Sequence, residues 1–373
     1  MKTYTQPATY SRNPITTSRP LRKFGRNLFY SIALPIIFML IAMILAYSAG
    51  ETLFVKFGDS AATTKNIMIF IKSVTLTIVA ALALNSNLNS GRMDFSLGAT
   101  GILAALLASE VLHGDVSTIQ NIVLFLLLTM LFGMILGFLN SLIFIFLKLP
   151  PIVMSLGMCL VFEGIAKVIV GGNSTRQLTD SEITGNFFIE PIVILPILAI
   201  VVIIMSLAFC YSKYGYNKNA LVYDQKISVD TGINEVTNCI ACFILAGALI
   251  GLYQVMDTCS LSSVQVKVDL GSSTTVFKNF LPIFIGGILA KYSNQIVGLL
   301  LAVISTTLLT TGMDAATSIG FTADVQSLIT GFSVFAVLVY MVDKQRFIEW
   351  VKKVRYVCTQ KRLGYKEMGG EAK

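Results

Sequence analysis

The chain has 373 residues, of which 55% are hydrophobic and only 13% are charged, and its mean hydropathy is +0.76. Soluble domains carry about 25% charged residues, so this composition excludes an ordinary soluble enzyme or binding domain. The formal net charge is +8, but it does not indicate nucleic-acid binding, because the basic residues gather at the two ends of the chain.

The two ends of the chain are polar and basic. Residues 1–27 hold six lysines and arginines and no acid, and nine more basic residues follow Val342. Lysine and arginine beside membrane segments mark the cytoplasmic side. The sequence therefore predicts a basic cytoplasmic N-terminal tail over residues 1–27, a transmembrane domain over 28–342 and a basic cytoplasmic C-terminal tail over 343–373.

Ten apolar runs follow one another between these tails. A helix that crosses a bilayer needs about 20 mostly apolar residues. The runs near this length are residues 29–49, 66–86, 94–112, 119–141, 150–170, 191–211, 237–256, 279–291, 295–312 and 325–342. The first exceeds the roughly 7 to 15 residues of a signal-peptide core, so we expect it to remain as a membrane helix. The predicted fold class is all-α, a polytopic transmembrane bundle of about ten spans.

The loop charges give this bundle an orientation. With both termini in the cytoplasm, ten spans place the basic segment 213–226 inside and the loops 110–115, 171–190 and 257–278 outside. The eighth span is short and contains Pro282. We therefore expect it to be broken, or to extend backwards into the segment before it.

Small residues recur at the spacing that brings membrane helices together. Gly133 and Gly137 lie four apart, as do Gly247 and Gly251, and such pairs let two helix backbones approach closely. A chance match in a glycine-containing apolar segment is the alternative. The glycine-bearing segments at 91–98 and 286–298 are weakly similar, which suggests an internal repeat.

Several kinds of chemistry are excluded by what the sequence lacks. It has no Gly-x-x-x-x-Gly-Lys-Ser/Thr loop, so the chain does not hydrolyse ATP by that route. His113 is the one histidine, which removes histidine-based metal sites and most catalytic triads. Cys239 and Cys242 have the spacing of a redox or metal motif, but with no second pair we interpret them as small buried residues.

Polar residues inside apolar sequence are the informative exceptions, because an ionised group at a helix centre costs about 2.5 to 3.5 kcal/mol on insertion scales. The stretch 85–94 is an ordinary cytoplasmic turn or a broken helix whose unwound backbone lines a cavity. Glu163 and Lys167 lie four apart in the fifth span. They either pair on one helix face or line a cavity.

The longest inner connection, residues 213–235, carries acids and a lysine around isoleucine and valine. Folded as a short amphipathic helix, it would present an apolar and charged surface to another protein. The alternative is a plain solvated loop.

Five segments in order resemble one known family. They are Ser90-Gly-Arg-Met-Asp-Phe-Ser-Leu-Gly98, Gly137-Phe-Leu-Asn140, Pro150-Pro-Ile-Val-Met-Ser-Leu-Gly157 followed by Glu163-Gly164, the stretch from Gly215 to Gly232-Ile233, and Ile285-Gly-Gly287. Together they are similar to the motifs of sugar-type permeases of ATP-binding cassette importers, the group of ribose, galactose and autoinducer permeases. The resemblance covers about residues 60–340.

The resemblance implies a permease subunit in the cell membrane of a prokaryote that moves a small polar solute, most simply a monosaccharide, by alternating access. It implies a second permease subunit in a homodimer or heterodimer, ATPase subunits and an external or periplasmic solute-binding protein as partners. ATP and Mg²⁺ would be bound by the ATPase, with no cofactor or metal in this chain. The expected pathway residues are Asp94, Ser96, Asn140, Ser155 and Glu163, and the expected ATPase-coupling residues are Gly215, Asp224, Lys226, Gly232 and Ile233.

Two other functions stay open on the sequence. The same family includes permeases for nucleosides and other small solutes. An ion-coupled secondary transporter that works without an ATPase would have a similar composition. A membrane enzyme is disfavoured, because no clustered catalytic set is present.

Overall fold

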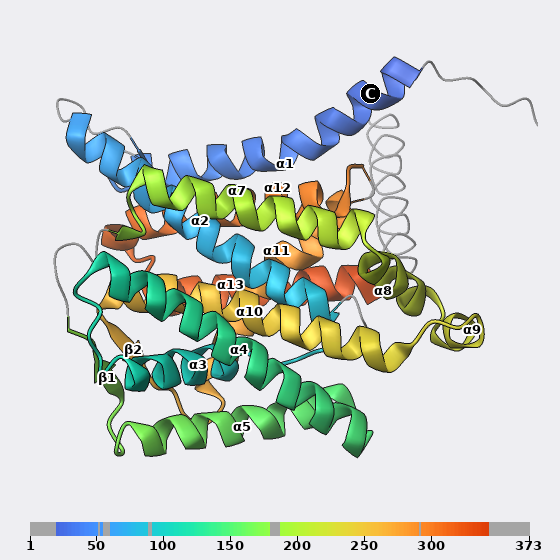
Figure 1. Ribbon diagram of the computed structural model, residues 1–373. Helices are drawn as coiled ribbons and strands as arrows, with labels where there is room; N and C mark the ends of the chain where they lie inside the picture. The colour runs from blue at the N-terminus through green and yellow to red at the C-terminus, as the bar shows by residue number, and fades with distance from the viewer. Residues whose placement is uncertain are drawn as a thin grey trace, which may run out of the picture.

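Helices make up nearly all of the chain that the computed structural model describes, which is residues 20–50, 53–54, 60–88, 92–179, 187–290 and 292–342. They pack as one bundle, with most long axes running along a common direction (Figure 1). The helices of the bundle are α1 (Pro20–Ser48), α2 (Ser60–Leu88), α3 (Leu97–Val111), α4 (Ile119–Leu147), α5 (Pro151–Ile169), α7 (Pro191–Ser206), α10 (Glu235–Leu261), α11 (Thr274–Leu289), α12 (Gln295–Ala315) and α13 (Ala323–Val342). The predicted all-α polytopic bundle is confirmed.

Each predicted span coincides with one of these helices, but they differ in length. Among the described residues, seven helices are long and apolar enough to cross a membrane: α1, α2, α4, α5, α7 with the π turn at Leu207–Tyr211, α10 and α12. In contrast, α3 has 15 residues and α11 has 16. At about 1.5 Å per residue these two fall short of a hydrocarbon layer about 30 Å thick, as expected of broken helices. The predicted backward extension of the eighth span is confirmed, because α11 begins at Thr274.

Helices α4 and α10 cross where their glycines meet. A Cβ added at Gly133 would lie 2.3 Å from the carbonyl oxygen of Gly247, and one added at Gly247 would lie 2.1 Å from that of Gly133. Gly137 and Gly251 also face backbone of the opposite helix. Packing at small residues drives helix association in lipid. The predicted packing role is therefore confirmed, and the chance-match alternative is wrong.

The glycines behind the predicted repeat pack in different ways. Gly98 lies against the carbonyl group of Ser272, whereas Gly286 and Gly298 lie against each other's helices, α11 and α12. Gly91 is outside the described residues. The internal repeat stays a prediction.

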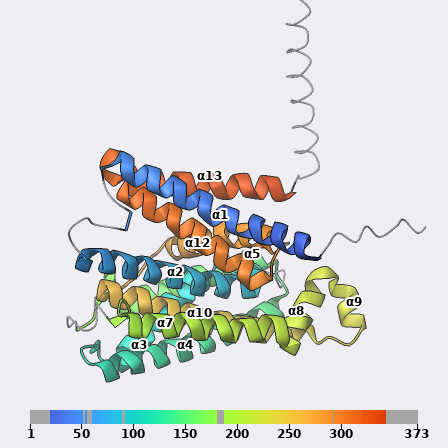
Figure 2. The ribbon, with the colours of Figure 1, turned by 90° about the horizontal axis from the view of Figure 1, so that it is seen from above.

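The connections sort to the two ends of the bundle. The strands β1 (Thr175–Gln177) and β2 (Ser263–Gln265) pair antiparallel at one end. The short helices α8 (Lys213–Tyr223) and α9 (Gln225–Asp230) extend beyond the bundle at the opposite end (Figures 1 and 2). The first turn of α1 and the last turn of α13 lie at the α8–α9 end (Figure 1). This is the sorting that the loop charges predicted for ten crossings.

The predicted tails are mostly beyond the described chain. Residues 1–19 and 343–373 lie outside the described residues. The rest of the predicted N-terminal tail is helical, because α1 begins at Pro20, earlier than the predicted span start at residue 29. The first turns of α1 therefore carry Arg22, Lys23 and Arg26.

The outer surface of the bundle is strongly apolar. Large side chains such as Phe146, Ile192 and Leu328 are 85%, 83% and 72% exposed. Exposed apolar surface on this scale marks a face that meets lipid or another protein. This surface is what a bilayer-embedded bundle requires.

The α4–α10 crossing generates a stability prediction. Replacing Gly247 with leucine forces side-chain atoms into the backbone of α4, so we expect a loss of about 1 to 3 kcal/mol in the free energy of unfolding. The loss is measured as a lower thermal midpoint of the purified protein in detergent. Gly157→Leu is the matched control, because an added Cβ there meets nothing within 4 Å. Equal midpoints for the two variants would contradict this account.

Candidate functional site

The interruption between α2 and α3 lies inside the bundle. Arg92, Asp94 and Ser96 are 6%, 3% and 0% exposed. A solvated turn would leave these polar side chains in water. The cytoplasmic-turn reading of residues 85–94 is therefore wrong for the part that is described, and the break places unwound backbone among packed helices.

Asp94 organises the polar groups at this break. Its Oδ1 accepts hydrogen bonds from the backbone N–H of Ser96, at 2.9 Å, and from the Ser96 hydroxyl. Its Oδ2 accepts from the side-chain amides of Asn140, at 3.3 Å, and Asn87, at 3.4 Å. The Asn140 amide also donates to the Ser96 hydroxyl at 2.8 Å. Three of the predicted pathway residues, Asp94, Ser96 and Asn140, thus form one buried network that holds the start of α3.

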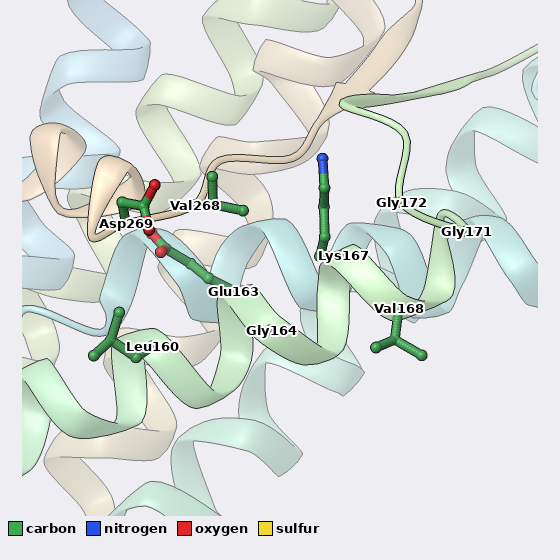
Figure 3. Close-up of a pocket in the computed structure, with 9 residues that line it drawn as sticks. All are labelled: Leu160, Glu163, Gly164, Lys167, Val168, Gly171, Gly172, Val268 and Asp269. Atoms are coloured by element: carbon green, nitrogen blue, oxygen red, sulfur yellow. The ribbon is translucent and has the colours of Figure 1, made fainter.

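Glu163 holds the segment before α11 in place, as Asp94 holds the start of α3. Its carboxylate accepts the backbone N–H groups of Leu270, at 2.9 Å, and Ser272, at 2.8 Å. Lys167 instead donates to the carbonyl oxygen of Asn173 at 2.9 Å, and Figure 3 shows its side chain pointing away from Glu163. Of the two alternatives for these residues, the Glu163–Lys167 ion pair is wrong, because two backbone N–H groups satisfy the carboxylate.

The cavity alternative for these two residues agrees with the structure. Both line a hollow of about 520 Å³ between α5 and the loop that carries Val268 and Asp269 (Figure 3). Ser155, the fifth predicted pathway residue, joins neither network. It is 2% exposed, and its hydroxyl donates to Ile152 O in its own helix at 3.1 Å.

The Asp94 and Glu163 networks meet at Ser272. An added Cβ at Gly98 would lie 2.1 Å from the Ser272 carbonyl oxygen, so only glycine lets this loop reach the start of α3. The Ser272 hydroxyl lies 3.2 Å from Cys159 Sγ on α5. Two helices that begin inside the bundle, α3 and α11, are therefore anchored against each other.

A polar groove is the main feature that the sequence reasoning missed. It has a volume of about 720 Å³ and lies between α2, α10, α11, α12 and α13. Its uncharged polar lining is Ser73, Thr77, Tyr253, Thr274, Asn279, Thr306, Thr307, Thr310, Gln326, Ser327, Thr330 and Ser333. None of the five predicted pathway residues lines it. The available signal was the recurrence of these residues every three or four positions in the last two spans, which puts them on one helix face.

The protruding helices α8 and α9 are tied to the buried break. The Tyr214 hydroxyl lies 2.7 Å from the Ser86 hydroxyl, and Lys218 Nζ donates to the carbonyl oxygen of Asn85 at 3.4 Å. Both partner residues lie in the last turn of α2. These contacts connect α8 to the segment that leads to Asp94.

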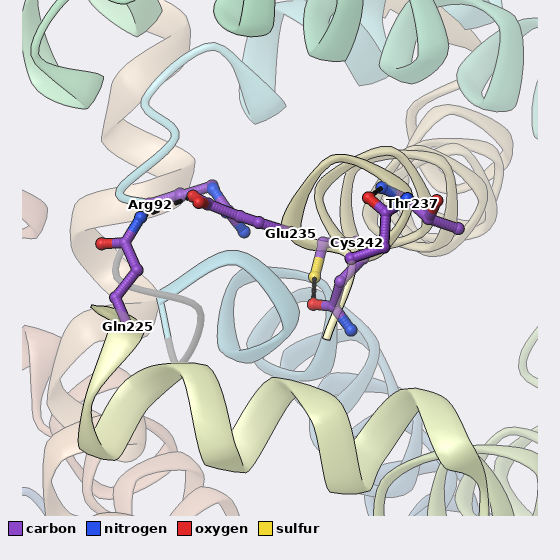
Figure 4. Close-up of polar contacts among 7 residues, drawn as sticks. Arg92, Gln225, Glu235, Thr237 and Cys242 are labelled. Carbon is purple, nitrogen blue, oxygen red and sulfur yellow. Dashed lines mark hydrogen bonds and ion pairs between the residues drawn. The ribbon is translucent and has the colours of Figure 1, made fainter. Parts of the chain in front are cut away.

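A second tie runs through Glu235 at the start of α10. Its Oε1 pairs with Arg92 Nη2 at 2.8 Å and accepts from Gln225 Nε2 at 2.7 Å. Figure 4 shows the three side chains converging from the α2–α3 break, α9 and α10. The Arg92 side chain is 7% exposed and that of Glu235 is 34% exposed, so the ion pair lies at the edge of the buried break and is partly screened by solvent.

The five predicted coupling residues all lie in or beside α8 and α9. Gly215 packs on the carbonyl groups of the π turn, where an added Cβ would lie 2.2 Å from Phe209 O. Asp224 caps α9, accepting from Ile227 N at 3.0 Å. Lys226 is an exposed residue of α9, and Gly232, at φ +93°, and the half-buried Ile233 follow that helix.

Lys218 is a buried cation outside the membrane-spanning helices. It is 1% exposed, and its Nζ lies 3.7 Å from the centroid of the Phe209 ring. Burial lowers the pKa of Lys218 to about 8, because desolvation disfavours the charged form. The contact with Phe209 stabilises the remaining charge.

The two cysteines and the histidine that the sequence analysis set aside lie where it predicted, buried and exposed respectively. Cys239 and Cys242 are buried and unbonded to each other, and His113 is exposed. No group of three or more histidine, cysteine or acidic residues able to hold a metal occurs among the described residues.

Similarity to known proteins extends over most of the chain. Residues 66–338 match the family described as branched-chain amino acid transport system / permease component. The chain is 26% identical over 267 residues to the fructose import permease protein FruF of Bifidobacterium longum (strain NCC 2705), covering 68% of this chain and 72% of that protein. It is 25% identical over 217 residues to the D-allose transport system permease protein AlsC of Escherichia coli (strain K12), covering 57% and 65%. No solved structure matches it.

The Asp94 network generates a second stability prediction, for which the chain offers a matched pair. Asp115 accepts from the N–H and hydroxyl of Ser117, as Asp94 does from Ser96. Replacing Asp94 with asparagine turns one amide N–H₂ toward buried donors, so we expect a loss of about 1 to 3 kcal/mol in the free energy of unfolding. Asp115→Asn, in the connection between α3 and α4, should cost no more than about 0.5 kcal/mol. Thermal midpoints of the two variants compare the losses, and equal shifts would contradict the organising role of Asp94.

Proposed function

Because the chain belongs to the branched-chain amino acid transport system / permease component family, we propose that it is the membrane permease subunit of an ATP-binding cassette importer. The proposed cargo is a small polar solute, with a monosaccharide as the favoured class. The observation that carries the proposal is the groove of about 720 Å³ lined by hydroxyl and amide side chains. Hydroxyls and amides placed around an apolar wall are what a sugar needs for orientation.

The two relatives support the solute class. Their names assign them fructose and D-allose, which are both monosaccharides. At about 25% identity the exact sugar does not transfer from one chain to another, so the proposal stops at the class.

The α8–α9 segment is the proposed contact for the partner ATPase. It protrudes from one end of the bundle (Figure 2) and exposes Tyr216, Val222 and Ile227 at 77%, 51% and 61%. The partner would bind ATP and Mg²⁺ and supply the hydrolysis. This chain's part is mechanical, because Tyr214, Lys218 and Glu235 link the segment to the buried break.

The groove lies toward the other end of the bundle. Its walls come from the end of α10, the start of α11, the end of α12 and the start of α13, and β2 follows α10 at that end. With both termini in the cytoplasm, as the basic tails predict, this end faces the outside. An external solute-binding protein would then deliver solute to the groove, and alternating access would open the path on the α8–α9 side.

Reconstitution tests the proposed function. The chain is purified with the ATPase and the solute-binding protein of the proposed importer, placed in proteoliposomes and assayed for uptake of labelled D-fructose, D-allose and uridine. We expect uptake of a sugar that requires ATP and both partners. ATP-dependent uptake of uridine alone would replace the sugar by a nucleoside. Uptake driven by an ion gradient without the ATPase would overturn the importer assignment.

Gly232 provides the sharper test of coupling. It closes the turn after α9 at φ +93°, a conformation that a β-branched residue adopts only with strain. We expect Gly232→Val to lower ATP-driven uptake at least about tenfold while ATP hydrolysis and membrane insertion continue, since about 1.4 kcal/mol of strain already corresponds to a tenfold change. Gly320→Val is the control, because Gly320 has φ +106° in the connection before α13. Unchanged uptake in the Gly232 variant would remove this segment from the mechanism.

A further inference from the structure

A group of charged side chains surrounds the groove on the side of α2, α10 and α11. The carboxyl group of Asp257 on α10 interacts electrostatically with three ammonium groups, those of Lys267, Lys72 and Lys278. Lys267 and Lys278 also repel each other. The four residues come from three helices, α2, α10 and α11, and from the loop before α11, and they share one charged neighbourhood.

This neighbourhood belongs to the groove. Lys278 lines the groove directly, as do Tyr253, one helical turn before Asp257, and Ser73, which follows Lys72. Lys267 Nζ donates to the hydroxyl of Thr274 at 3.5 Å, and Thr274 is also a lining residue. The charged group thus borders the hydroxyl-rich surface.

Positive charge is in excess here. Three lysines interact electrostatically with Asp257. Glu163 acts on Lys267 more weakly than Asp257 does, and its carboxylate already accepts the N–H groups of Leu270 and Ser272. The two ion pairs found among the described residues, Arg92–Glu235 and Arg176–Glu110, involve none of these lysines. Lys278 lines the groove, and none of the three lysines forms an ion pair within the described chain.

The burial of Lys72 makes the excess positive charge energetically costly. It is 9% exposed and lies twelve residues after the start of α2, which is about 18 Å along the helix. A lysine near a helix end can extend to the membrane surface, but one at this depth needs a partner inside the protein or in a water-filled cavity. The hydroxyl of Thr307 on the groove wall also has no hydrogen-bond partner in the described structure.

We propose that the groove takes an anionic polyhydroxylated solute, a sugar that carries a carboxylate or a phosphate. Its anionic group would lie among Lys72, Lys267 and Lys278, and its hydroxyls would meet the hydroxyl and amide lining. Asp257 keeps the three ammonium groups together without neutralising them. This inference rests on the proposed transport function and narrows its substrate class, because the sugars named for the two relatives are neutral.

The electrostatic part is tested on the permease alone. Ser327, on the α13 wall of the groove, is replaced by cysteine in a chain that lacks Cys210 and Cys358. The chain is held in phosphatidylcholine nanodiscs, and the probes are the sulfonatoethyl and trimethylammonioethyl methanethiosulfonates, which are similar in size and opposite in charge. The measured quantity is the reagent ratio, which is the reaction rate of the negative reagent divided by that of the positive one, each relative to its rate with a free thiol. We expect this reagent ratio to exceed one. Lys278→Met and Lys72→Met should each lower this ratio about threefold or more, as expected for loss of a unit charge at about 10 Å.

The matched control is Lys65→Met. Lys65 is an exposed lysine on α2, the helix that carries Lys72, and it does not line the groove. It should leave the ratio unchanged. If Lys72→Met does not fold, the exposed Lys278 still decides the outcome. Repeating the measurement in phosphatidylglycerol shows whether a lipid headgroup is the anion. A ratio near one, a ratio independent of both lysines, or a ratio abolished by the anionic lipid would overturn the proposal.

Transport then identifies the anionic group and separates the two hypotheses. The reconstituted importer is given D-galacturonate against D-galactose, and D-glucose 6-phosphate against D-glucose. ATP-driven uptake of one acid above its neutral counterpart supports the inference and selects carboxylate or phosphate. Uptake of the neutral sugars in preference overturns the inference while the importer function stands. A lysine-dependent reagent ratio with no ATP-driven uptake of any sugar would instead remove the importer function and leave the cationic groove.

Discussion

Backbone that leaves the helical pattern can lie at membrane depth only where the protein itself supplies hydrogen-bond partners, because lipid has none. In this chain two carboxylates meet that requirement. Asp94 accepts the N–H of Ser96 at the start of α3, and Glu163 accepts the N–H groups of Leu270 and Ser272 before α11. Each carboxylate is 3% exposed, and each holds a helix too short to cross the bilayer. The bundle can therefore contain helix ends in its interior.

These interior helix ends are connected to both ends of the bundle. Toward α8 and α9, the last turn of α2 is held by Tyr214 and Lys218, and Arg92 pairs with Glu235. Toward the β1–β2 end, the Glu163-bound loop leads straight into α11, whose first turns form a wall of the groove. The contact between Gly98 and Ser272 joins the two sides. A continuous set of packed groups thus connects the α8–α9 end of the bundle to the groove.

The polar groups of the interior divide into two kinds. The Asp94 and Glu163 carboxylates accept hydrogen bonds from protein donors and hold the backbone at two helix starts. The groove is lined by hydroxyl and amide side chains, several of which bond to groups of their own helix, and by Lys278, and it is large enough for a small solute. The expected solute-pathway role of Asp94, Ser96 and Asn140 stays a prediction. In the structure these three side chains bond to one another at the start of α3, and none of them lines the groove.

The sequence by itself determined that the chain is built for lipid, that it is helical, and which loops lie together at each end of the bundle. It could do so because hydropathy and charge act locally along the chain. It also located the close α4–α10 crossing, since glycine spacing within one helix decides how near a neighbour can come. Only the tertiary structure decided the partners of the buried charges. Glu163 binds a loop more than a hundred residues away instead of Lys167, and the groove draws its lining from five helices. Such choices depend on which helices become neighbours, and one-dimensional spacing does not contain that information.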